Sequence, residues 1–125
     1  MRAFLILMVL GLAGCAKQEV PALPCAALQD GCILAKGRIF VQSDKPPTPL
    51  KPFEITVTAP SAQTLTVALS MQGMEMGTNR YRLTRHAAGE WRAQVTLPVC
   101  VTGRRDWQMW VEMDNERHAL TFQTQ

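Results

Sequence analysis

Three methionines lie within a short segment between two stretches of alternating apolar and polar residues, Met71-Gln72-Gly73-Met74-Glu75-Met76-Gly77. Thioether sulfurs are soft ligands that suit Cu(I), and they stay available in an oxidising compartment. The spacing in a loop bounded by glycines allows two or three sulfurs to turn toward one point. Met74 and Met76 are therefore candidate Cu(I) ligands. Met71 continues an alternating stretch, so we expect it to pack in the core, where methionine fills irregular gaps.

Cys100 is a third candidate ligand, in a separate predicted loop over residues 97–103. Its thiolate would bind a soft metal more strongly than a thioether. The two imidazoles, His86 and His118, lie in a predicted hairpin and a predicted edge-like strand, where solvated surface histidines are the usual finding. The sequence thus predicts a Cu(I) site that uses Met74, Met76 and Cys100.

The residues do not predict catalysis or nucleic-acid binding. No serine lies in a nucleophile-elbow context, and a dyad of Cys100 with a histidine would need two scarce residues to meet. The net charge is +3 and falls to +2 without Arg2, with acidic and basic residues mixed along the chain. An arginine-rich stretch over residues 80–92 is expected on a solvated sheet face rather than at an anion or lipid-headgroup site.

The N-terminus has one basic residue, an apolar run and then Leu12-Ala13-Gly14-Cys15. The run is too short for a permanent membrane span, which needs roughly 20 apolar residues. Small residues before Cys15 suit a peptidase site, so residues 1–14 are expected to be removed as a signal peptide. The segment resembles bacterial lipoprotein signals, which implies that Cys15 carries the lipid. Because Ala16 rather than Asp follows, the resemblance favours the periplasmic face of the outer membrane.

Export places the remaining cysteines in an oxidising compartment, where disulfides persist. Cys25, Cys32 and Cys100 are an odd number, so at least one thiol stays free or pairs between molecules. Cys25 and Cys32 flank a turn-forming segment, which favours a local bridge between them. A bridge from Cys100 to either one is the alternative.

About 110 residues remain after processing, near the usual size of one domain. Residues 15–31 have no sustained periodicity and are expected to be a lipidated tether, and residues 32–125 one β domain. Alternation of period two predicts about seven strands. They centre on residues 33–41, 53–59, 65–71, 81–83, 91–97, 107–113 and 120–122, with a hairpin loop at 86–90. This pattern predicts an all-β, antiparallel sandwich of immunoglobulin-like type, with a small β-barrel as the alternative.

Residues 50–113 resemble the FixH/YtkA-like periplasmic domains. The resemblance rests on the apolar strand before Met-x-x-Met-x-Met-Gly, the Gly89-Glu90-Trp91 hairpin, Leu97-Pro98, and the segment Trp107-Gln108-Met109-Trp110-Val111. That family has an immunoglobulin-like sandwich and is associated with copper handling and assembly of haem-copper oxidases. Two features depart from it: a lipid anchor replaces the transmembrane helix of FixH, and Cys100 stands in a loop that usually lacks a cysteine.

The expected function is therefore a lipid-anchored periplasmic protein that binds copper or delivers it to an envelope protein. The alternative is a lipoprotein without metal whose sandwich contacts an envelope complex. Methionines that act as a surface for sensing or absorbing oxidants are a third hypothesis.

Overall fold

The described structure contains ten strands in two five-stranded sheets. The computed structural model describes residues 21–71, 79–99 and 103–124. Sheet A contains, in spatial order, β1 (Leu23–Pro24), β10 (Glu116–Gln123), β9 (Asp106–Met113), β5 (Leu65–Ser70) and β6 (Arg80–Arg82). Sheet B contains β2 (Cys32–Leu34), β3 (Ile39–Ser43), β4 (Phe53–Thr58), β8 (Glu90–Val95) and β7 (Thr84–Ala87). All neighbouring pairs are antiparallel except β1 and β10, which are parallel.

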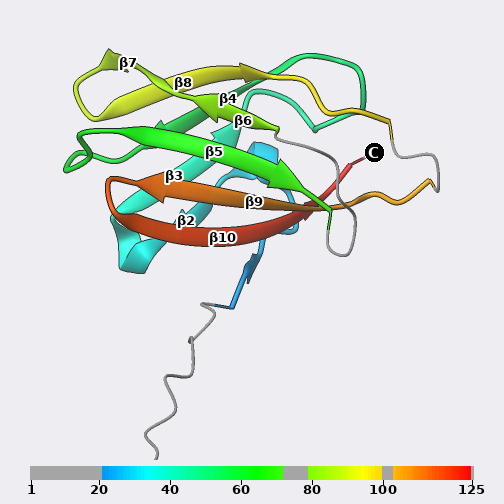
Figure 1. Ribbon diagram of the computed structural model, residues 1–125, viewed down its shortest axis with the longest axis horizontal. Coiled ribbons are helices and arrows are strands. Elements are labelled where there is room, and N and C mark those ends of the chain that lie inside the picture. Colours follow the sequence, from blue (N-terminus) through cyan, green and yellow to red (C-terminus); the bar gives the residue numbers. More distant parts are fainter. Residues whose placement is uncertain (1–20, 72–78, 100–102, 125) are drawn as a thin grey trace, which may run out of the picture.

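The sheets lie face to face as a sandwich, as Figure 1 shows, and the described strands do not close into a barrel. The all-β, mainly antiparallel architecture predicted from the sequence is thus confirmed, and the barrel alternative is wrong. No helix in the described ranges is long and apolar enough to cross a membrane.

The core is built by strands whose side chains point alternately into the sandwich and away from it. In β9, every second residue from Trp107 to Met113 is buried while the residues between them are partly exposed. The same pattern buries Leu65, Val67 and Leu69 in β5, opposite the apolar face of sheet B. Trp91 and Trp107 are both core residues, at 6% and 1% exposure, so the strand register predicted for them is confirmed.

Two predicted elements are divided differently in the structure. The stretch expected as one strand over 33–41 is interrupted by a 3-10 turn, η2 (Ala35–Gly37), in which Ala35 and Lys36 have positive φ. The predicted hairpin loop over 86–90 is shorter, because β7 includes His86 and Ala87. Between β6 and β7, Leu83 is buried and its N–H donates to the Leu65 carbonyl, so the chain passes there from sheet A to sheet B.

The predicted boundary between tether and domain is wrong at its C-terminal side. Residues 23–31 belong to the sandwich: β1 pairs with β10, the 3-10 helix η1 (Leu28–Asp30) follows, and Leu28 and Cys25 are buried. The segment has no period because its elements are only two and three residues long. A disulfide joins Cys25 to Cys32, with their Cα atoms 6.1 Å apart, as the sequence favoured. It links the residue directly after β1 to the first residue of β2, and so joins the two sheets at one edge.

Candidate functional site at one end of the sandwich

Three long connections meet at one end of the sandwich, which we call the loop end. They follow β3 (residues 44–52), β5 (71–79) and β8 (96–105). The pairing sets these positions within each sheet: Ser70, the last residue of β5, lies opposite Gln108 near the start of β9, and Phe53, the first residue of β4, lies opposite Val95, the last of β8. In Figure 1 the arrowheads of β5 and β8 and the start of β9 lie on the same side.

The candidate copper ligands belong to two of these connections. Met74 and Met76 fall in the connection after β5 and Cys100 in the one after β8, and all three lie outside the described residues. Cys15 lies outside them as well. The described strands nevertheless place the starts and ends of both connections at the loop end. Segments whose candidate ligands are 24 to 26 positions apart in sequence are thus attached to the same part of the fold.

Met71 is a core residue, as the sequence predicted, with 1% of its surface exposed. The register of β5 with β9 continued by one residue places Met71 opposite Trp107, which in turn lies opposite Phe122 of β10. All three side chains are buried. They form an apolar row beneath the loop end, where the connection after β5 starts and the connection after β8 ends.

The histidines are not part of this end. His86 is exposed in β7, whose partner residues are at the start of β8, at the opposite end of sheet B. His118 lies opposite Val111 in sheet A, and its Nε2 is 3.0 Å from a Glu116 carboxylate oxygen. Within the described ranges, no three His, Cys, Asp or Glu side chains cluster as metal ligands would.

Buried polar atoms at the loop end were not predicted by sequence reasoning. Asn79 Nδ2, Trp107 Nε1 and Thr124 Oγ1 are buried, and none has a hydrogen-bond partner in the described structure. Buried polar groups without partners are uncommon and call for an explanation. Asn79 precedes β6 and Thr124 follows β10, so both lie beside the described ends of these connections. No sequence signal identifies such atoms, because their isolation depends on packing between strands.

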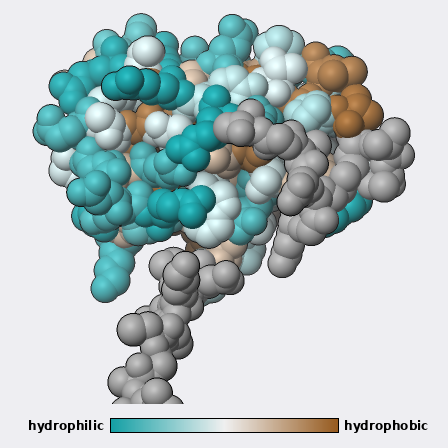
Figure 2. Space-filling view, viewed as in Figure 1, coloured by the Kyte–Doolittle hydropathy of each residue, from teal (hydrophilic) through white to brown (hydrophobic). Residues whose placement is uncertain are grey.

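An exposed apolar patch also lies at the loop end. Leu50 is 65% exposed and Val99 57% exposed, and the Leu50 N–H donates to the Leu97 carbonyl, which brings their two connections together. Figure 2 shows a brown patch at the upper right, where these connections run in Figure 1. We call Leu50 and Val99 the Leu50 patch.

Leu50 has a φ of 64°, in the left-handed region. It occupies the third position of a turn closed by the Lys51 N–H on the Thr48 carbonyl, with Pro49 at the second position. Glycine is the favoured residue there, and a residue with a β-carbon costs roughly 1–2 kcal/mol in that conformation. The exposed leucine is thus held in an unfavourable backbone conformation by a proline-rich connection.

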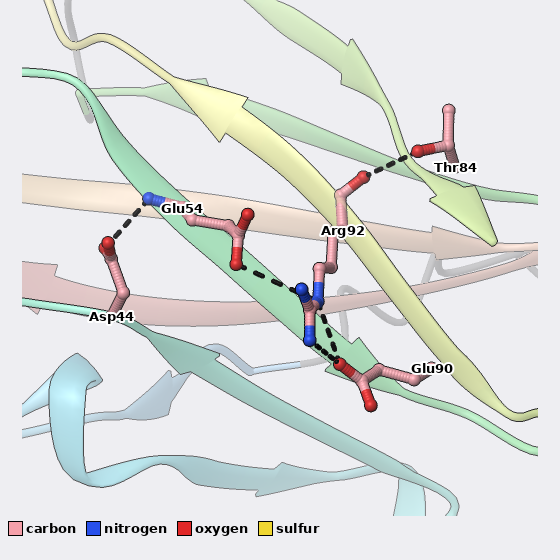
Figure 3. A network of polar contacts seen from close by, with 5 residues as sticks. All are labelled: Asp44, Glu54, Thr84, Glu90 and Arg92. Atoms are coloured by element: carbon pink, nitrogen blue, oxygen red, sulfur yellow. Dashed lines mark hydrogen bonds and ion pairs between the residues drawn. The ribbon is translucent and has the colours of Figure 1, made fainter. Parts of the chain in front are cut away.

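One ion pair lies where the connection after β8 meets β9. Arg104 binds Asp106 through Nε and Oδ1 at 3.0 Å, and this hydrogen bond lowers the pKa of the Asp106 carboxyl. On the outer face of sheet B, Arg92 contacts both Glu90 and Glu54, and its carbonyl accepts from Thr84 (Figure 3). Arg80 and Arg92 of the arginine-rich stretch therefore form ion pairs on partly exposed sheet faces, the kind of location that the sequence favoured.

Among the described residues, the carboxyl group with the largest pKa shift is that of Glu116, which lies away from the loop end. Its pKa falls to about 2, because it accepts hydrogen bonds from Arg38 and then from His118. The Arg38 Nη atoms lie 3.1 and 2.8 Å from the two carboxylate oxygens. This bidentate pair connects the start of β10 in sheet A to the β2–β3 hairpin of sheet B.

An open hollow of about 430 Å³ lies between the loop end and the β1 edge. It is lined by Pro24, Cys25, Ala26, Asp106, Thr121, Phe122 and Gln123. Asp106 is its only titratable lining residue apart from the disulfide-bonded cysteine, and that carboxylate is already paired. The hollow therefore lacks the converging polar groups of a catalytic site.

Comparison with protein-family models, with curated proteins and with solved structures finds no significant match to this chain.

Proposed function

We propose that this chain is a lipoprotein anchored at the periplasmic face of the outer membrane, and that it binds Cu(I) at the loop end through Met74, Met76 and Cys100. It would deliver copper to an envelope protein, in keeping with the resemblance to FixH/YtkA-like, immunoglobulin-like domains and with a role in haem-copper oxidase assembly. The chemistry of the three sulfurs fits Cu(I), which prefers thioether and thiolate ligands.

The observation that carries this proposal is the attachment of two connections to one end of the sandwich. Both the segment with Met74 and Met76 and the segment with Cys100 start and end on strand termini at the loop end. The disulfide gives a second argument. Because Cys25 and Cys32 bind one another, neither is available to Cys100, and on this proposal Cys15 carries the lipid. The Cys100 thiol is thereby left for a metal or for another molecule.

Cu(I) titration against a competing chelator, with ascorbate keeping copper reduced, tests the site. We expect the double variant Met74→Leu/Met76→Leu to bind Cu(I) more weakly with an almost unchanged apo melting curve, because such swaps cost under about 1.5 kcal/mol each even in a core. Cys100→Ser should weaken binding further. Met71→Leu is the matched control, since Met71 is buried below the site and its loss should leave the affinity unchanged.

If the double leucine variant binds Cu(I) as tightly as the parent, the methionines are not ligands. The better proposal is then a lipoprotein without metal that contacts an envelope complex. The Leu50 patch favours this second function, because exposed leucine and valine side chains on a preorganised connection suit a protein contact.

The lipid anchor has its own test. We expect Cys15→Ala to yield an uncleaved precursor or a protein released from the outer membrane, because acylation needs the thiol and the peptidase acts on the lipidated cysteine. Membrane fractionation and intact mass measurement check this result. Normal processing with retention in the outer-membrane fraction would contradict the lipoprotein assignment.

A further inference from the structure

The edge of the sandwich where the described chain begins is apolar and exposed. β1 and β2 are the outermost strands of sheets A and B on this side, and the Cys25–Cys32 disulfide joins them. Leu23 of β1 is 41% exposed and Ile33 of β2 is 62% exposed. We call this region the disulfide edge. In Figure 1 the described chain enters here, through the blue strand below β10 and β2.

Ile33 belongs to an apolar pair on the outer face of sheet B. It lies opposite Phe40 of β3, which is only partly buried, and opposed residues of an antiparallel pair share a face. The Phe40 ring lies across Gly31, where an added β-carbon would overlap it. Among the described strands, none pairs with the outer side of β2. An open edge strand with an exposed isoleucine is a liability unless something covers it.

We propose that the disulfide edge rests on the lipid surface of the membrane that holds the anchor. This inference depends on the proposed lipidation of Cys15. Eight residue steps separate Cys15 from Leu23, and even fully extended they span at most about 29 Å. A domain of this size has a radius of gyration of about 13 Å. The tether is therefore no longer than the body is wide, and the edge at which it joins the body is the one that meets the bilayer.

The charges on this edge indicate an apolar contact rather than an electrostatic one. Lys36 and Asp30 are both exposed and offset one another, and Arg38 is paired with Glu116. Binding should therefore depend little on salt or on anionic lipid. The opposite edge differs: β7 is the last strand of sheet B and carries Thr84, Arg85 and His86, all exposed. The Leu50 patch lies at the loop end and stays free for a protein.

Fluorescence quenching on the intact lipoprotein tests the orientation. The full chain, purified from membranes, is reconstituted into phosphatidylethanolamine–phosphatidylglycerol vesicles that contain a phospholipid with a nitroxide near its headgroup. A fluorescent amino acid replaces Ile33 in one variant, Lys36 in a second and His86 in the matched control. All three positions are exposed, so the replacements should not disturb the core.

We expect the probes at positions 33 and 36 to lose emission to the nitroxide lipid and the probe at 86 to keep it, at low and at high salt. Equal quenching at 33, 36 and 86 on protein that carries acyl chains and floats with the vesicles would overturn the orientation and leave the anchor intact. Quenching at positions 33 and 36 that disappears at high salt would overturn the apolar contact. Protein without acyl chains that fails to float would overturn both the anchor and the orientation.

Discussion

Replacing Trp107 with alanine should lower the free energy of unfolding by about 3–5 kcal/mol, the usual cost of truncating a large aromatic core residue. Trp107 is 1% exposed and lies between Met71 and Phe122 in the apolar row beneath the loop end. Domains of this size have about 5–15 kcal/mol of stability in total. The variant should therefore melt at a much lower temperature, or be largely unfolded, in a calorimetric or circular dichroism experiment.

Trp110→Ala is the matched control for this prediction. Trp110 lies in the same strand, but three positions on, so its side chain is on the outer face of sheet A. It is partly exposed, and the Arg117 guanidinium lies 4.2 Å from its ring centroid. We expect a clearly smaller loss than for Trp107→Ala. If the order were reversed, β9 would have its other face in the core, which is what a shift of one residue in register produces.

Alternation in the sequence predicted the strands that build the core, because burial of one sheet face imposes a period of two. It worked best for long strands such as β9 and β5, where each inward residue is apolar. It failed where the backbone rather than the side chains decides the structure. The break between β2 and β3 has positive φ at Ala35, Lys36 and Gly37, and a single glycine was too weak a signal to divide the stretch that the apolar pattern predicted as one strand.

The prediction that residues 23–31 belong to a tether was wrong for a related reason. β1 is a two-residue strand held by β10 from the other end of the chain, with the Cys25 N–H donating to the Thr121 carbonyl at 2.8 Å. No local pattern in two residues predicts such a partner. The burial of Leu28 also depends on a tertiary contact, because η1 packs beside β3.

For the candidate site, the sequence could predict ligand types but not their common location. Residue chemistry selected Met74, Met76 and Cys100, whereas the pairing of β5 with β9 and of β4 with β8 is what attaches their two segments to one end. The exposed Leu50 was also missed, since the proline-rich segment predicted only a loop. Its positive φ belongs to a turn position where glycine is expected, and its hydrogen bond to Leu97 depends on a connection 47 residues away.

Removal of the Cys25–Cys32 disulfide is the second change with a large expected effect. The double variant Cys25→Ala/Cys32→Ala should lose about 2 kcal/mol of unfolding free energy, the chain-entropy cost of opening so short a loop. Alanine avoids leaving a new thiol, and it avoids burying a hydroxyl at Cys25, which is 4% exposed. Denaturant unfolding of the oxidised parent and the double variant measures the difference.

Cys100→Ala separates this effect from a general loss of cysteine. We expect it to unfold like the parent under oxidising conditions, because the described disulfide uses Cys25 and Cys32 alone. Full reduction of the parent should reproduce the double variant. If Cys100→Ala were destabilised as much as the double variant, Cys100 would have to take part in the stabilising bridge.

The loss of stability on removing the disulfide should begin in one part of the molecule. The bond joins the edge strands of two different sheets, and β1 has only two residues paired with β10. In the double variant, amide hydrogen exchange should therefore accelerate first at position 25, whose N–H donates to the Thr121 carbonyl, while β9 and β5 stay protected, since local opening follows the weakest contacts. Uniform acceleration across both sheets would show instead that the disulfide edge unfolds together with the core.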